Sequence, residues 1–220
     1  MSREFGPRYS EGHDVEEGVL GKINPEAAFE IEKRKNAMED YITFAEALDI
    51  VKKSQPFKDP SDPHEKPFPY DVHATVAKTL ELENFEQLRY YTAVRSKLDF
   101  FHGVDAFLEL QLPDGRTLRV DMDMTTNPQK MGKEHRILVE WPKDGLNLKD
   151  PEDKNIFKHL VKKTSGDIVD GFTGQAESNG LIIRSMDLEE LQRSRALAAR
   201  EEEQLVQHAR KHQRKGAHAR

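Results

Sequence analysis

The chain has 220 residues, of which 36% are hydrophobic and 34% are charged, and it contains no cysteine. That length suits one mid-sized domain with appendages, and the charged share exceeds the roughly 25% that is typical of compact domains. The lack of cysteine excludes disulfide frameworks, thiolate metal sites and cysteine nucleophiles.

No apolar run approaches the roughly 20 residues that a membrane helix needs. The first residues, MSREFGPRYSEGHDVEEG, lack the apolar core of a secretory signal, so we expect a cytoplasmic protein without a membrane partner. The net charge of −6 is uneven, since the residues after Glu203 include basic side chains and no acid. Any contact with nucleic acid must come from local basic surfaces or this tail, because an acidic body repels phosphate.

The N-terminal part of the chain is expected to lie outside the main core. Residues 1–23 mix glycine, proline and charged residues without periodicity, which predicts a flexible arm. Asn24 before Pro25 is typical of a helix start. Thr43 has the spacing of a capping box with the glutamate that follows three residues later. We therefore expect a helical extension and a proline-rich linker over residues 24–70.

A mixed core is expected over residues 71–184, and a long charged helix with a basic tail over residues 185–220. Helical patterns and strand-forming runs alternate in the core. This predicts the α/β (α+β) class, with a small mixed central sheet flanked by helices. The expected core elements are a helix over 71–86, strands over 89–94, 104–112, 116–125, 136–141 and 180–184, and a helix from Asp150 that ends near Gly166.

Two of these strands are predicted to form a hairpin around Pro113-Asp114-Gly115. Proline and aspartate suit the centre of a type I turn, and the glycine supplies the left-handed residue that closes a three-residue loop. This loop pairs Leu112 with Arg116, and the same register pairs Ala106 with Met122. Apolar residues then share one face of the hairpin, which supports the register.

Acidic residues collect on the opposite face of this hairpin. The register pairs Glu109 with Arg119 as an ion pair. It also places Asp105 opposite Asp123, with Asp121 one step away on the same face. Opposed β-carbons in a sheet lie roughly 4.5–5.5 Å apart, where like charges destabilise the pairing. The carboxylates therefore need a cation, a proton or basic neighbours.

Two interpretations account for the close carboxylates: they bind a divalent cation, or they lie on a solvated surface. Hard ions such as Mg²⁺ or Mn²⁺ prefer carboxylate oxygens and water. Such an ion polarises a phosphoryl oxygen and lowers the pKa of a bound water. In the second interpretation the acids extend into water, and the hairpin has only a structural role. The pattern alone gives the two interpretations equal weight.

Two segments, SKLDFFHGVDAF at 96–107 and RVDMDMTTNPQK at 119–130, resemble divergent members of the PD-(D/E)XK nuclease superfamily. In that family an aspartate follows a glycine near the start of the second strand, and the third strand carries an acid, any residue, then a lysine. Gly103-Val104-Asp105 looks like the first element, and Asp123-Met124-Thr125 looks like the second. The resemblance implies a restriction-endonuclease-like core that binds Mg²⁺ or Mn²⁺ and cleaves nucleic acid.

Thr125 stands where the family has its lysine. That lysine positions the attacking water and stabilises charge on the phosphate, so the resemblance implies that another lysine takes the role. Lys130 is the first choice and Lys133 the alternative. Asp121 is a competing choice for the second acid and a further candidate ligand and catalytic residue.

Many members of the family also use a glutamate on the leading helix. Glu83 is the choice here for a metal ligand, with Glu81 and Glu86 as alternatives. His102, beside Gly103, is a candidate for contact with phosphate. A loop histidine more often has a structural role.

Three hypotheses about function follow. The first is a divalent-metal-dependent nuclease that acts on phosphodiester bonds, with DNA favoured over RNA. The second is a nuclease-like fold that has lost catalysis and serves as a binding or assembly protein. The third is a helical interaction protein whose hairpin is only structural. A homodimer is left open by the sequence.

Overall fold

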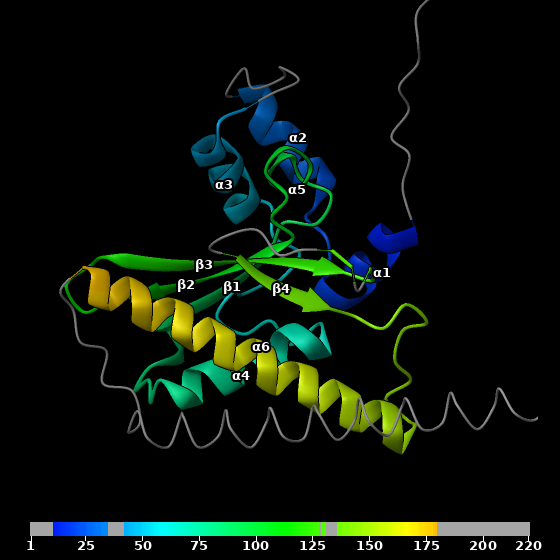
Figure 1. The fold of residues 1–220 in the computed structure, drawn as a ribbon. Helices are drawn as coiled ribbons and strands as arrows, with labels where there is room; N and C mark the ends of the chain where they lie inside the picture. Colours follow the sequence, from blue (N-terminus) through cyan, green and yellow to red (C-terminus); the bar gives the residue numbers. More distant parts are fainter. Residues whose placement is uncertain (1–10, 35–41, 128, 131–135, 180–220) are drawn as a thin grey trace, which may run out of the picture. The chain divides into compact units, whose positions relative to one another are not determined.

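The computed structural model describes residues 11–34, 42–127, 129–130 and 136–179 of the chain. Within these residues the protein has helices on both sides of a four-stranded mixed sheet, which confirms the expected mixed α/β class (Figure 1). In chain order the elements are α1 (Glu11–Leu20), α2 (Pro25–Arg34), α3 (Phe44–Lys53), α4 (Pro67–Thr79), the 3₁₀ helix η1 (Phe85–Gln87), β1 (Leu88–Thr92), α5 (Lys97–His102), β2 (Ala106–Gln111), β3 (Thr117–Thr125), β4 (Arg136–Glu140) and α6 (Pro151–Ser178).

The chain divides into two compact units, Met1–Ile183 and Arg184–Arg220. The strand expected over 180–184 and the long charged helix with its basic tail over 185–220 lie outside the described residues. Helices α1, α2 and α3 belong to the same unit as the sheet. Helices α2 and α3 lie within the helical extension expected over residues 24–70.

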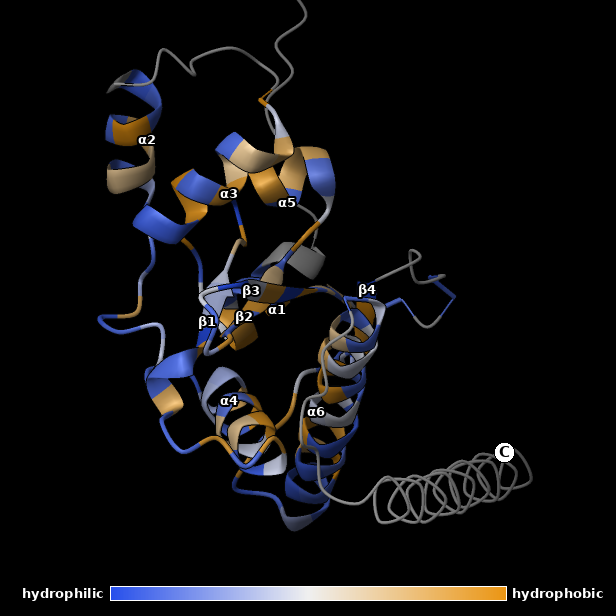
Figure 2. Ribbon diagram, turned by 90° about the vertical axis from the view of Figure 1, so that its left-hand side faces the viewer, coloured by the Kyte–Doolittle hydropathy of each residue, from blue (hydrophilic) through white to orange (hydrophobic). Residues whose placement is uncertain are grey.

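The sheet has the strand order β1-β2-β3-β4. The first three strands form an antiparallel meander, and β4 runs parallel to β3. Helices α2, α3 and α5 gather on one side of the sheet, whereas α4 and α6 lie on the other side (Figures 1 and 2). The sheet is the middle layer between these two groups of helices.

The predicted hairpin is confirmed, together with its register. Gly115 has a φ of 86°, as the closing residue of the turn requires. The N–H of Leu112 donates to the carbonyl of Arg116 at 2.8 Å. Ala106 pairs with Met122, and the pairs between these two ends follow the predicted order. The turn residues thus set which side chains face each layer of helices.

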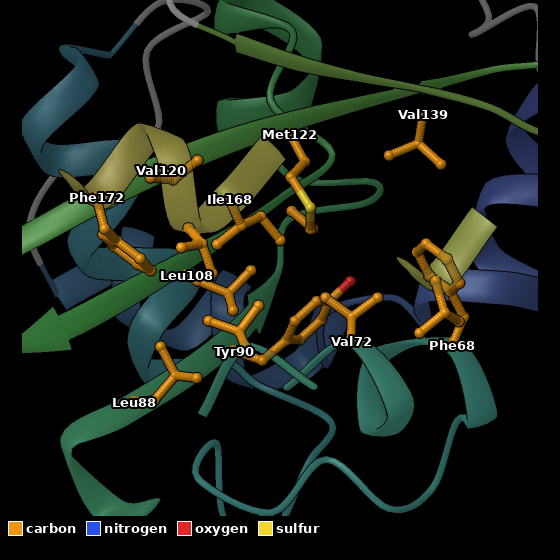
Figure 3. Packing of buried hydrophobic residues seen from close by; sticks show 14 of the residues in the cluster. Phe68, Val72, Leu88, Tyr90, Leu108, Val120, Met122, Val139, Ile168 and Phe172 are labelled. Carbon is orange, nitrogen blue, oxygen red and sulfur yellow. The ribbon is translucent and has the colours of Figure 1, made fainter. Parts of the chain in front are cut away.

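Both faces of the sheet are buried, against different helices. On one face Phe107 stacks on Tyr91 with ring centroids 4.9 Å apart, and both pack with Ile50 of α3 and Leu98 of α5. The other face forms the larger core with α4 and α6. Figure 3 labels ten residues of that core, namely Phe68, Val72, Leu88, Tyr90, Leu108, Val120, Met122, Val139, Ile168 and Phe172.

Residues 11–20 form helix α1, which corrects the expectation of a flexible arm for that part of the range 1–23, while residues 1–10 lie outside the described residues. Leu20 is buried, and Val15 and Val19 pack against the larger core. The helix contacts α4 and β3. Its apolar residues recur at helical spacing, but over too short a stretch to outweigh the surrounding glycines and charges in the sequence.

The helix starts predicted for α2 and α3 are confirmed. The Asn24 side chain accepts hydrogen bonds from the N–H groups of Glu26 and Ala27, each at 3.1 Å. Thr43 and Glu46 form both hydrogen bonds of a capping box at the start of α3. Such caps satisfy N–H groups that the first turn of a helix leaves without partners.

The proline-rich segment is an ordered loop along the outer edge of β1. The N–H of Tyr90 donates to the carbonyl of Pro60 at 2.8 Å. The Gln55 amide donates to the carbonyl of Thr92 at 2.9 Å and accepts the N–H of Thr92 at 2.9 Å. Helix α4 then begins at Pro67, earlier than predicted, because proline suits the first turn of a helix. The segment thus supplies the hydrogen bonds that an edge strand lacks.

Helix α6 continues past Gly166, where the sequence predicts its end. Ile168, Val169 and Phe172 are buried in the larger core. Burial of such side chains contributes about 1.5–3 kcal/mol each, which exceeds the cost of about 1 kcal/mol for a glycine inside a helix. Neither α6 nor any other helix in the described part of the chain is long and apolar enough to cross a bilayer.

Gly171 marks the close approach of α6 to β3, since a β-carbon there would lie 2.9 Å from Cγ2 of Val120. Val120 is buried and β-branched, so it has little freedom to move aside. We expect Gly171→Ala to lower the free energy of unfolding by about 1–3 kcal/mol in urea denaturation. Gly174→Ala is the matched control, because nothing lies within 4 Å of a β-carbon there. It should be neutral or stabilising, and equal stability of the two variants would contradict the close packing.

Candidate functional site

The acidic face of the hairpin lies beneath helices and not in open water. Asp105, Glu109 and Asp123 are 4%, 9% and 5% exposed. Phe107, between the first two of these along the chain, packs with residues of α3 and α5. The interpretation in which the acids extend into solvent is therefore wrong. Buried carboxylates need partners, because desolvation penalises an uncompensated charge.

Glu109 obtains its partner from the helix above it. Its carboxylate lies 2.6 Å from Nζ of Lys52 on α3. The predicted ion pair between Glu109 and Arg119 is replaced, although the two residues do oppose each other in the sheet. Arg119 instead turns along its own strand to Asp121 at 2.9 Å, with its guanidinium 4.7 Å from the ring centre of Phe44.

Asp123 pairs with Lys130, the lysine that the sequence analysis selects first. Nζ of Lys130 lies 2.7 Å from Oδ1 of Asp123. The turn after β3 explains how a lysine seven positions later reaches this carboxylate. The side chains of Thr125 and Asn127 accept backbone N–H groups two residues further on, and the N–H of Lys130 donates to the carbonyl of Asn127. The chain thereby turns back toward β3 immediately after leaving it.

Asp105 is hydrogen-bonded to the two residues of β3 that flank Asp123 in the sequence. Helix α5 ends at Gly103, whose φ of 66° is left-handed, and the chain then enters β2. The backbone N–H of Asp105 donates to the carbonyl of Met122 at 3.0 Å. Its Oδ2 accepts the N–H of Met124 at 2.6 Å. Asp105 therefore lies level with Asp123, as the continued register predicts.

The pKa of Asp105 is raised to about 9, first by burial and then by the charges of Asp99 and Glu16. The hydrogen bond from Met124 lowers the pKa, and the charge of Asp123 raises it least among the named causes. At neutral pH the carboxyl group therefore carries a proton. Basic neighbours therefore balance the charges of Asp121 and Asp123, and a proton neutralises Asp105.

Asp99 and Glu16 are the acids that sequence reasoning missed. Asp99 lies on α5, is 8% exposed, and accepts the N–H of Arg95 at 2.8 Å. Ser96 and Gly103 cap that helix at its two ends, a signal that could have placed Asp99 just before Asp105. Glu16 lies on α1, and recognising the helical spacing of the apolar residues there would have brought it into consideration.

Glu83 is not brought to this site, which corrects its choice as a metal ligand. It is exposed in the segment between α4 and β1, as are Glu81 and Glu86. That segment leads to Leu88, which pairs with Leu110, whereas Asp105 precedes Ala106 at the other end of β2. Glu83 and Asp105 therefore lie at opposite ends of the paired strands β1 and β2. Glu16, from the first helix, is the upstream glutamate that lies near Asp105.

The remaining candidates have mainly structural surroundings. His102 lies 3.2 Å from the carbonyl of Ile42 through Nε2 and packs edge-on against Phe44. Thr125 is 7% exposed and accepts the N–H of Asn127. Lys133 lies outside the described residues.

Arg136 lies beside the strand that carries Asp121 and Asp123. It opposes Asp121 at the start of β4, and its Nη1 donates to the carbonyl of Gly103 at 2.8 Å. The guanidinium thus connects β4 with the turn that precedes Asp105. It also places a permanent positive charge at the end of α5.

Oxygen donors for a hard cation are present, but they do not form a complete cage. Among the residues that the structure describes, no three His, Asp or Glu side chains are arranged to hold a metal ion. Asp121 is engaged by Arg119 and Asp123 by Lys130, and Asp105 carries a proton, so a cation here would have to displace one of these partners. Mg²⁺ is commonly held by one or two carboxylates, with water and substrate phosphate as its other ligands. Asp105 and Asp123, which lie level with each other on neighbouring strands, are the residues that would hold such an ion.

Comparisons of the chain with protein-family models, with curated proteins and with solved structures found no match.

The protonated state of Asp105 makes stability depend on pH. Its folded-state pKa of about 9 lies above the ordinary value of 3.8, so its contribution is present at low pH and is lost as pH rises toward 9. We expect Asp105→Asn, which keeps an acceptor for Met124, to be more stable relative to the native protein at pH 8 than at pH 5. Chemical denaturation at both values measures this difference.

Asp144→Asn is the control for that experiment, because Asp144 is an exposed aspartate away from the hairpin. It should leave the pH dependence of the unfolding free energy unchanged. A native-like pH dependence in Asp105→Asn would show that the carboxyl group is already ionised at neutral pH.

Proposed function

We propose that this protein is a divalent-metal-dependent nuclease of the PD-(D/E)XK type, which hydrolyses phosphodiester bonds and prefers DNA to RNA. The observation that carries the proposal is the group formed by Asp105, Asp123 and Lys130. Lys130 lies 2.7 Å from Asp123, and Asp105 is hydrogen-bonded to the residues on both sides of Asp123. An aspartate after a glycine, a second aspartate on the next strand and a lysine beside it form the set that the resemblance implies.

In this proposal the two aspartates are metal ligands and the lysine acts on the substrate. Asp105 and Asp123 would supply the oxygen ligands, and Asp105 would release its proton to water as they do so. A bound Mg²⁺ or Mn²⁺ supplies a polarised phosphoryl oxygen and a water of lowered pKa. Lys130, whose side chain is 38% exposed, is accessible to a phosphate and to the attacking water. Its ammonium group offsets charge that develops on the phosphate.

A second candidate function is a nuclease-like fold that binds nucleic acid or assembles with other proteins without cutting. It is favoured by Thr125 at the usual lysine position and by the buried proton on Asp105. A metal must displace that proton, which weakens binding at neutral pH. The two functions differ in whether a bond is broken.

A cutting assay with the full chain tests the proposal. Plasmid and short single-stranded and duplex oligonucleotides are incubated with Mg²⁺ or Mn²⁺, and the melting temperature is measured with and without metal. We expect metal-dependent cutting that Asp105→Asn and Asp123→Asn abolish together with the metal-induced rise in melting temperature. Lys130→Ala should lower the cutting rate about 100-fold or more while the metal-induced rise remains.

Lys154→Ala is the matched control, because Lys154 is an exposed lysine on α6. It should cut at the native rate. Stabilisation by metal without cutting by the native chain would favour the binding function. Cutting that survives in both aspartate variants, or no response to metal in the native chain, would refute the proposed nuclease.

A further inference from the structure

Phe100 is an aromatic side chain that the fold leaves in solvent. It is 77% exposed, compared with 52% for Phe85, 50% for Phe29 and 46% for Tyr70. Single exposed apolar residues are ordinary on protein surfaces. Phe100 differs in its position and in how firmly its helix is held.

Helix α5 holds Phe100 outward as part of a fixed element. Ser96 caps the start of the helix through hydrogen bonds to the N–H groups of Leu98 and Asp99, and Gly103 ends it with two backbone hydrogen bonds. Leu98, on the inner face of the same helix, is fully buried. The ring of Phe101 meets the ring of Phe100 edge-on, with centroids 4.9 Å apart. The exposed ring therefore has a supported orientation, which lowers the entropy cost of using it in binding.

Phe100 lies on the short helix that leads directly into the turn before Asp105. Phe100 directly follows Asp99, whose charge acts on Asp105. The helix ends three residues later at Gly103, whose carbonyl accepts a hydrogen bond from Arg136. The helix that carries Phe100 and the guanidinium of Arg136 thus meet at the turn before Asp105. Exposed aromatic rings stack on bases, and cations neutralise the phosphates between them.

We propose that Phe100 stacks on a nucleobase of an unpaired strand beside the phosphate that Asp105 and Asp123 act on. This inference rests on the proposed nuclease function, and it deepens it by naming the substrate class. Bases within a duplex already stack on their neighbours, so a protruding ring can take only a base that is single-stranded or displaced. The preferred substrate is therefore single-stranded or locally opened nucleic acid, bound with little sequence preference.

Direct binding without metal separates this inference from catalysis. The full chain is titrated into a fluorescein-labelled oligothymidylate and into a duplex of the same length, both in chelator, and anisotropy is recorded. We expect Phe100→Ala to weaken binding to the single strand about 5- to 150-fold, the range that alanine substitution of a stacking aromatic gives. Phe100→Trp should retain the native affinity, and Phe100→Ala should change binding to the duplex less than binding to the single strand.

Phe85→Ala is the matched control, since Phe85 is an exposed aromatic residue in η1. This helix leads into Leu88, the end of β1 that lies away from Asp105. It should bind the single strand as the native chain does. The inference is overturned if Phe100→Ala binds the single strand normally, if Phe85→Ala is equally impaired, or if the native chain does not bind the single strand. A change of oligomeric state in Phe100→Ala with unchanged binding would instead assign the ring to contact between copies of the chain, and it also overturns the inference.

The cutting assay distinguishes the two proposals. Loss of single-strand binding in Phe100→Ala, with no metal-dependent cutting by the native chain, retains the stacking role and removes the nuclease. Metal-dependent cutting with equal rates and affinities for the native chain and Phe100→Ala retains the nuclease and removes the stacking role.

Discussion

The pairing of β2 with β3 is the constraint on which the rest of the described structure depends. Side chains alternate along a strand, so a slip of one residue would turn the acids into the larger core and the aliphatic side chains toward α3 and α5. The turn at 113–115 and the matched apolar residues prevent that slip. The same register brings Asp105 level with Asp123, which makes the candidate site a consequence of how the sheet folds.

Burial of the acidic face determines how its charges are balanced. Lys52 reaches Glu109 from α3, Arg119 reaches Asp121 along β3, and Lys130 reaches Asp123 from the following turn. Removing one partner of a buried pair leaves a charge without compensation, which costs more than breaking a pair at the surface. Asp105 is balanced by a proton, and a proton is a group that a cation can replace. In the proposed function, the cation would replace the proton of the same carboxyl group whose protonation makes stability depend on pH.

Local rules in the sequence predicted the hairpin, its register and the helix caps, because each depends on a few adjacent residues. The turn at 113–115 and the capping box of α3 are of this kind. Long-range packing decided what the sequence analysis missed. Helix α6 passes Gly166 because its later residues are buried in the larger core, and α1 forms against α4 and β3. Glu83 was misplaced because the sequence does not show which end of β2 lies beside the start of β1, and Asp105 lies at the other end.

The loop that borders β1 also limits how copies of the chain can associate. An open edge strand invites another chain to extend the sheet. At β1 the outward N–H groups of Tyr90 and Thr92 are already bonded to Pro60 and Gln55. A neighbouring molecule would have to break these bonds and displace a loop stiffened by proline before it could add a strand. Fusion of two sheets through β1 is thus blocked by the chain itself, and this edge is protected from aggregation.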